Sequence, residues 1–191
     1  MKYWLFSSLC YLSILTMAQD ALPYSQIPDY PESYTSSTVA ARVVDGLGFR
    51  YYWATEGLSD QDLAYQPSVD AQTVLQTIDH ILGLTDVLLN TVKSNPHTGT
   101  NMEGLSFEEK RKKTLQKIEE ASNILKQSNG VEEMKMIFQG GNGSTEFPFW
   151  NLLNGPLSDA IYHTGQIVTF RRTTGNPINP NISVLRGIKR D

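Results

Sequence analysis

The sequence predicts an all-α protein built as a four-helix bundle. Apolar residues recur at three- and four-residue steps over several long stretches, and capping residues, glycine or proline bound each stretch. The 191-residue chain is long enough to form one domain with a sizeable core. We expect the bundle at residues 34–176, between an extended N-terminal arm at 19–33 and an irregular C-terminal tail at 177–191.

The N-terminal residues have the pattern of a secretory signal peptide. Lys2 gives a positive start, residues 3–17 are an almost uncharged apolar run, and Ala18 is a small residue suited to cleavage. The run is shorter than the roughly 20 residues that span a bilayer. We therefore expect residues 1–18 to be removed, with no stable membrane insertion afterwards and an exported, periplasmic or secreted location. Cys10 is the single cysteine, so the mature chain would contain neither a disulfide nor a thiol.

The charge balance argues against a nucleic-acid partner. The chain has 16 basic and 20 acidic residues, whereas nucleic-acid-binding proteins normally carry a basic face. The densest basic run, residues 110–113, is surrounded by glutamates, which favours a solvated helix face. Apolar helix faces left over from the bundle would allow a homodimer, although no heptad repeat specifies one.

The first helix is expected from about residue 34 to Glu56, where Gly57 provides the stop. The connection that follows, residues 58–69, is polar and should not form a continuous helix. The apolar residues of the helix form a stripe that should face the core: Val39, Val43, Leu47 and Tyr51 at four-residue steps, widened by Ala40 and Val44.

The second helix, at about residues 71–94, has the most regular period in the chain. On a helical wheel His80 lies outside the solvent arc, between Leu84 and Val87, on an apolar flank that should face a neighbouring helix. His97, beyond the end of this helix, is expected in an exposed loop. The core stripe consists of Val74, Ile78, Ile81, Thr85, Leu88 and Val92.

The third helix begins with a capping box, in which Ser106 and Glu109 satisfy each other's backbone amides, and it ends near residue 128. Alternating apolar residues on both sides of a glycine-rich turn then predict a short hairpin at about residues 134–147. The last helix is expected to begin near Pro156 and to end at Gly175. Its core positions are Leu157, Ala160, Ile161, Thr164, Ile167 and Val168.

The candidate functional site combines His80 with a polar stripe on the last helix. Asp159 and His163 are four residues apart, so their side chains lie on one helical face, and Gln166 continues the stripe. We expect the three residues to face the bundle interior, because bundles build metal sites there from ligands on facing helices. Two imidazoles with one carboxylate suit zinc, iron, nickel or manganese. The hypothesis is a divalent metal ion held by these two histidines and the aspartate, with Gln166 supporting them.

Each of these residues also has a purely structural interpretation. His80 can be a hydrogen-bonded core histidine. Asp159 can complement the dipole of a helix that begins at Pro156, and Gln166 can be a buried amide bonded to the backbone. Spacing alone therefore leaves a metal site and a structural polar network equally open.

Two stretches resemble the DinB-like, or DinB/YfiT-type, family of four-helix metalloenzymes. They are EGLSDQDLAYQP at 56–67 leading into VLQTIDH at 74–80, and DAIYHTGQI at 159–167. The family pattern is a histidine on the second helix and a His-x-x-x-His pair, followed by Gly-Gln, on the last. His80, His163 and Gln166 match this pattern, and Asp159 stands where the pair has its first histidine. A carboxylate at that position shifts the metal preference toward harder cations.

The resemblance implies a metal-dependent enzyme, and we expect a hydrolase or transferase that acts on a small molecule of unknown identity. Characterised relatives look like thiol transferases or isomerases that use a low-molecular-weight thiol, but export would separate this chain from such thiols. No catalytic base follows from the spacing of Glu56, Asp79 or Glu146. The second hypothesis is a non-catalytic exported binding or stress protein. An open cavity that reaches His80 and His163 would favour the enzyme.

Overall fold

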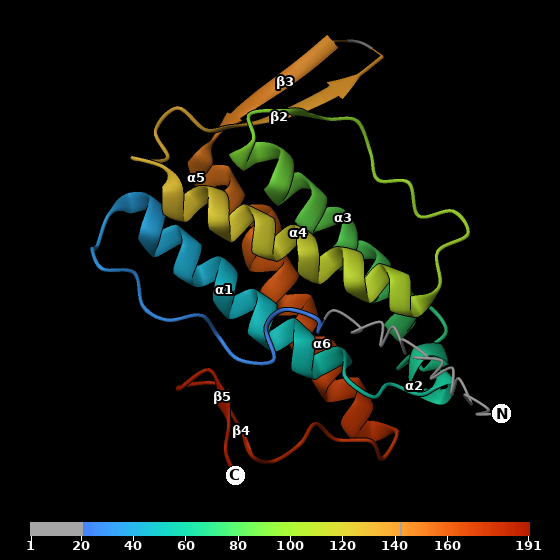
Figure 1. Ribbon diagram of the computed structural model, residues 1–191. Coiled ribbons are helices and arrows are strands. Elements are labelled where there is room, and N and C mark those ends of the chain that lie inside the picture. Colours follow the sequence, from blue (N-terminus) through green and yellow to red (C-terminus); the bar gives the residue numbers. More distant parts are fainter. Residues whose placement is uncertain (1–20, 142) are drawn as a thin grey trace, which may run out of the picture.

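Helices dominate the computed structural model, which describes residues 21–141 and 143–191 (Figure 1). This part of the chain has four long helices: α1 (Ser36–Thr55), α3 (Val74–Val92), α4 (Phe107–Gln127) and α6 (Ser158–Thr173). Both α4 and α6 pack against α1 and α3. The prediction of a helix-rich chain with four long helices is thus confirmed. The predicted signal peptide at 1–18, with Cys10, lies outside the described residues.

Short-range hydrogen bonds fix where the helices begin. Thr35, Thr73 and Ser106 cap α1, α3 and α4, and each forms a reciprocal capping box with the residue three positions later. The box predicted between Ser106 and Glu109 is therefore confirmed. A further box, from Ser59 to Asp62, starts the short helix α2 (Asp60–Ala64) inside the connection that the sequence predicted to be polar. None of the helices in the described segments combines the length and apolarity needed to cross a bilayer.

The core contains the predicted stripe of α3 but only part of the stripe predicted for α1. All six residues of the α3 stripe are buried. On α1, Ala40, Val44, Leu47 and Tyr51 are buried. The prediction was wrong for Val39 and Val43, whose exposed fractions are 52% and 43%.

The buried arc of α1 is rotated away from these two valines because polar and small residues take part in packing. Asp45 and Gly48 are fully or nearly fully buried on the opposite edge of the arc. The N-terminal arm, which has no helix or strand over residues 21–33, covers this edge. The Tyr24 ring lies so close to Gly48 that a Cβ atom there would come within 2.5 Å of it.

Asp45 connects the arm, α1 and α4. Its Oδ1 accepts hydrogen bonds from the Tyr24 hydroxyl at 3.0 Å and from Ser122 Oγ at 2.6 Å, and Lys126 Nζ lies 2.9 Å from Oδ2. Burial, together with the Asp45 charge, raises the pKa of Tyr24 far above its usual range. A buried carboxylate with three partners therefore fixes how these segments sit on one another.

The basic run at the start of α4 is solvated only in part: Lys112 and Lys113 are exposed as predicted, whereas Lys110 and Arg111 face inward. Lys110 is buried, and its Nζ lies 2.7 Å from Asp79 Oδ1 on α3. Arg111 donates from Nε to Thr55 Oγ1 at 2.9 Å and also pairs with Glu56 at the end of α1. These two side chains face inward because α4 packs against both α1 and α3.

A small sheet follows α4. Strands β2 (Lys135–Gly140) and β3 (Gly143–Pro148) form the predicted antiparallel hairpin. Strand β1 (Pro96–His97) pairs with β2 in parallel, where the sequence predicted an exposed loop. The tail predicted to be irregular contains an antiparallel pair, β4 (Ile182–Ser183) and β5 (Ile188–Lys189), which Figure 1 shows at the opposite end of the molecule.

The last helical segment begins earlier than predicted and is broken. It consists of α5 (Phe149–Leu152), a π-helical turn η1 (Leu153–Leu157) and α6. The break occurs because Pro156 has no backbone N–H to donate and disfavours a helical Gly155, which has φ −98° and ψ −108°. The Ser158 hydroxyl donates to the Leu153 carbonyl at 2.6 Å and so satisfies one carbonyl at the break.

Two buried charged side chains join the C-terminal end of α6 to α1 and α2. Arg171 Nη1 donates to the carbonyl oxygens of Trp53, Ala54 and Glu56 at 2.9–3.1 Å, which satisfies the C-terminal end of α1. Asp62 is 1% exposed and accepts hydrogen bonds from three residues: Ser59, Thr174 and Asn176. Burial raises the pKa of the Asp62 carboxyl, but these hydrogen bonds outweigh it and hold the pKa well below its usual range.

Asp62→Asn should destabilise the protein and weaken its acid sensitivity. A lowered folded-state pKa adds stability that is complete above the unfolded pKa, at about 3.9, and is lost as the pH falls through the folded value. At neutral pH we expect a loss of roughly 1–3 kcal/mol in the free energy of unfolding, since the amide cannot accept all of these hydrogen bonds. Urea denaturation at neutral and acidic pH measures both effects.

The matched control is the exposed neighbour Asp60→Asn, which should change the stability by less than about 0.5 kcal/mol. The difference between wild type and Asp62→Asn should shrink as the pH is lowered. Equal differences at neutral and strongly acidic pH would contradict the assigned role of Asp62.

Candidate metal centre

Two distant segments meet where α3 packs against α6. His80 Nε2 on α3 lies 3.1 Å from Asp159 Oδ2 on α6, and His163 Nε2, one turn further along α6, lies 3.3 Å from Asp159 Oδ1. The two imidazole rings are 4.7 Å apart between centroids and nearly perpendicular. The structure therefore brings together all three residues that the sequence nominated, and their ligand atoms lie within 4.8 Å of one another.

Gln166 sets the chemical state of the His163 ring. Its Oε1 lies 2.6 Å from His163 Nδ1. An amide oxygen only accepts hydrogen bonds, so in this contact His163 Nδ1 carries a proton, as it does both in the neutral Nδ1–H ring and in the imidazolium. Gln166 thus contacts a side chain rather than the backbone, and it prepares Nε2 to act as a ligand.

The site is open to solvent, contrary to the prediction that its residues face the interior of the bundle. The exposed side-chain fractions are 41% for His80, 43% for Asp159 and 17% for His163. The wheel placed His80 toward its neighbour α6 correctly, but it could not show that the two helices meet at the surface.

An open depression along the broken helix is lined by Asp159, but neither His80 nor His163 is part of its lining. The rest of the lining comes from Leu84 on α3 and from residues of η1 and α6, including Tyr162. The Tyr162 ring is 65% exposed and packs edge-on against His163, with centroids 5.4 Å apart. Sequence analysis did not nominate Tyr162. The sequence signal that could have identified Tyr162 was its position directly before His163, on the exposed side of the last helix.

The other titratable candidates are engaged elsewhere. Glu56 pairs with Arg111, Asp79 with Lys110, and Glu146 with Lys135 at 2.9 Å. His97 belongs to β1, and its ring packs against Phe138 at 5.8 Å between centroids. None of these four residues is among the group that could hold a metal ion in the described part of the chain.

The donor set fits a divalent cation. Two imidazole nitrogens and one carboxylate are ligands that zinc and other first-row divalent ions accept. The contacts of 3.1 and 3.3 Å involve different oxygens of Asp159, and the three ligand atoms, one from each residue, lie within 4.8 Å of one another, against the roughly 3.3 Å that separates the ligands of a tetrahedral ion. Comparisons with protein-family models, curated proteins and solved structures give no match. The DinB-like resemblance therefore remains an expectation from the sequence. The geometry also fits an alternative, in which protonated imidazoles pair directly with the carboxylate.

Gln166→Leu should change the tautomer of His163 in the metal-free protein. Without the amide oxygen, the ring proton should move from Nδ1 to Nε2, where it can be donated to Asp159. Nitrogen-15 NMR of the imidazole nitrogens, recorded at alkaline pH with a chelator present, distinguishes the two tautomers. The His97 signals serve as an internal control, because that ring lies in β1 and does not contact Gln166. An unchanged Nδ1–H signal from His163 in the variant would show that Gln166 does not set the tautomer.

Proposed function

We propose that this protein is an exported DinB-like metalloprotein whose four long helices form a bundle of the DinB/YfiT type. The divalent ion is held by His80, Asp159 and His163, and the activity is a hydrolysis or group transfer on a small molecule. The observation that carries the proposal is the convergence of two imidazole Nε2 atoms on one carboxylate across the α3–α6 contact. Two imidazole nitrogens and a carboxylate that meet at one point supply the ligand types of a divalent-ion site.

The residues around the ligands are suited to an open catalytic site. Gln166 fixes the His163 ring, and Asp159 offers one oxygen to each imidazole. A divalent ion in such a site supplies Lewis-acid chemistry to a bound reactant. The open depression beside Asp159 would admit that reactant, with Leu84 and Tyr162 as its apolar walls.

A second function, that of a non-catalytic binding or stress protein, is favoured by the direct contacts in the same cluster. The distances of 3.1 and 3.3 Å are also ordinary for charged imidazole–carboxylate pairs, which would join α3 to α6 without an ion. Carboxylates suited to act as a general base are paired elsewhere, as shown for Glu56, Asp79 and Glu146. Metal content separates the two functions.

The purified protein, prepared without added metal or chelator, should contain close to one divalent ion per chain. His80→Ala and His163→Ala should each remove most of it, because two remaining ligands bind a divalent ion weakly. His97→Ala is the matched control and should retain the metal, since this third histidine of the chain lies in β1. Inductively coupled plasma mass spectrometry measures the amount and the identity of the ion.

Thermal unfolding with and without added zinc or manganese gives an independent measurement. An ion that binds only the folded protein raises the melting temperature by an amount that grows with the logarithm of its concentration relative to its Kd, and both histidine variants should lose that response. A wild-type protein that neither contains metal nor responds to any supplied divalent ion would contradict the enzyme and support the structural network.

A further inference from the structure

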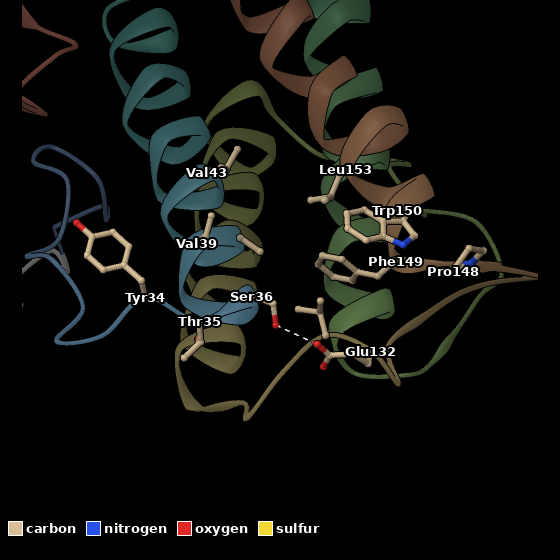
Figure 2. Close-up of a pocket in the computed structure, with 12 residues that line it drawn as sticks. Tyr34, Thr35, Ser36, Val39, Val43, Glu132, Pro148, Phe149, Trp150 and Leu153 are labelled. Carbon is tan, nitrogen blue, oxygen red and sulfur yellow. Dashed lines mark hydrogen bonds between the residues drawn. The ribbon is translucent and has the colours of Figure 1, made fainter.

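A second cavity, of about 520 Å³, lies between α1 and α5, away from the histidines. Figure 2 shows Val39 and Val43 of α1 on one side, and Phe149, Trp150 and Leu153 on the other. Most of its lining is apolar, and its volume is within the roughly 300–1,000 Å³ of small-molecule pockets.

The helix break keeps this cavity open. Beyond the break, α6 packs against both α1 and α3, whereas α5 contacts α3 and the strands β2 and β3. The two valines of α1 face α5 across the cavity without packing against it and remain about half exposed. Trp150, on the opposite wall, is 75% exposed, while Ala40 and Phe149 are buried. Such a combination of a packed base and exposed apolar walls is typical of a site that binds an apolar group.

One charged group lies at the end of the cavity. Glu132, in the loop after α4, is the single acidic residue of the lining, and the lining contains no lysine, arginine or histidine. Its Oε1 accepts a hydrogen bond from the Ser36 hydroxyl at 3.3 Å, which Figure 2 marks at the lower end of the cavity. A carboxylate beside an apolar surface attracts a cation and repels an anion, and this attraction is stronger next to a low-dielectric wall than in open water.

We propose that this cavity binds a small amphipathic amine, with its apolar body between α1 and α5 and its ammonium group on Glu132. The ammonium donates to the carboxylate in a charge-assisted hydrogen bond, while Val39, Val43 and Leu153 remove the apolar body from water. A neutral analogue of the same shape gains only the apolar contacts. A carboxylate analogue is repelled by the negative charge of Glu132. The proposal does not depend on metal binding at His80 and His163.

Isothermal titration calorimetry on the whole protein tests this with three probes of one shape: 1-naphthylmethylamine, 1-naphthylmethanol and 1-naphthoate. The amine should bind about tenfold more tightly than the alcohol, as a charge-assisted hydrogen bond predicts, and the naphthoate most weakly. Glu132→Gln should weaken amine binding about tenfold and leave the alcohol unchanged. Glu133→Gln, at an exposed neighbour outside the lining, and His80→Ala should leave all three affinities unchanged.

Several results would overturn the proposal. Equal affinities for amine and alcohol, or an unchanged amine affinity in Glu132→Gln, would exclude recognition of the charge. Val43→Arg should fill the cavity and abolish binding of every probe while circular dichroism remains native; if this variant does not fold, the Glu132→Gln comparison decides alone. Analytical ultracentrifugation measures the oligomeric state of the wild type and of Val43→Arg. A wild-type dimer that Val43→Arg converts to a monomer would also overturn the proposal, because it would assign the cavity to a second copy of the chain.

Discussion

The helix break at Gly155 and Pro156 determines where both candidate sites lie. A continuous helix from Phe149 to Thr173 would present one straight face to its neighbours. Because Pro156 cannot donate a backbone hydrogen bond, the segment divides into α5 and α6, and these two helices pack against different neighbours. The α6 part stays against α3 and brings Asp159 and His163 to His80, while the α5 part leaves space beside α1.

Buried polar contacts then fix the helices relative to one another. Arg171 holds the end of α6 on the carbonyl end of α1, Asp45 joins α1 to α4 and the arm, and Lys110 joins α4 to Asp79 on α3. Burying these charges carries a desolvation cost that the ion pairs only partly offset, so their main effect is on which arrangement forms. Apolar faces can slide past one another, but a buried charge must meet its own partner. This set of contacts therefore favours one packing arrangement of the long helices.

The fold could be predicted from the sequence wherever one face of a helix is uniformly apolar. The stripe of α3 from Val74 to Val92 is buried as its period predicts, because its one polar member, Thr85, donates its hydroxyl to the Leu82 carbonyl of the same helix. On α1 the same reasoning failed for Val39 and Val43. The buried arc there includes Asp45 and Gly48, whose contacts come from distant segments. The arm residue Tyr24 meets both, and α4 supplies two further partners of Asp45. Periodicity reports polarity, and it cannot anticipate a polar residue whose partner comes from a distant segment.

For the candidate site, sequence spacing predicted the group but not its surroundings. The interval of four residues between Asp159 and His163, and of three between His163 and Gln166, fixes contacts along a single helix, and the structure shows them. Solvent exposure depends instead on how two helices meet. His80 and Asp159 are exposed because α3 and α6 meet at the surface. Gly155 and Pro156, where the helix breaks, line the same depression as Asp159, so the break shapes the solvent-exposed side of this cluster.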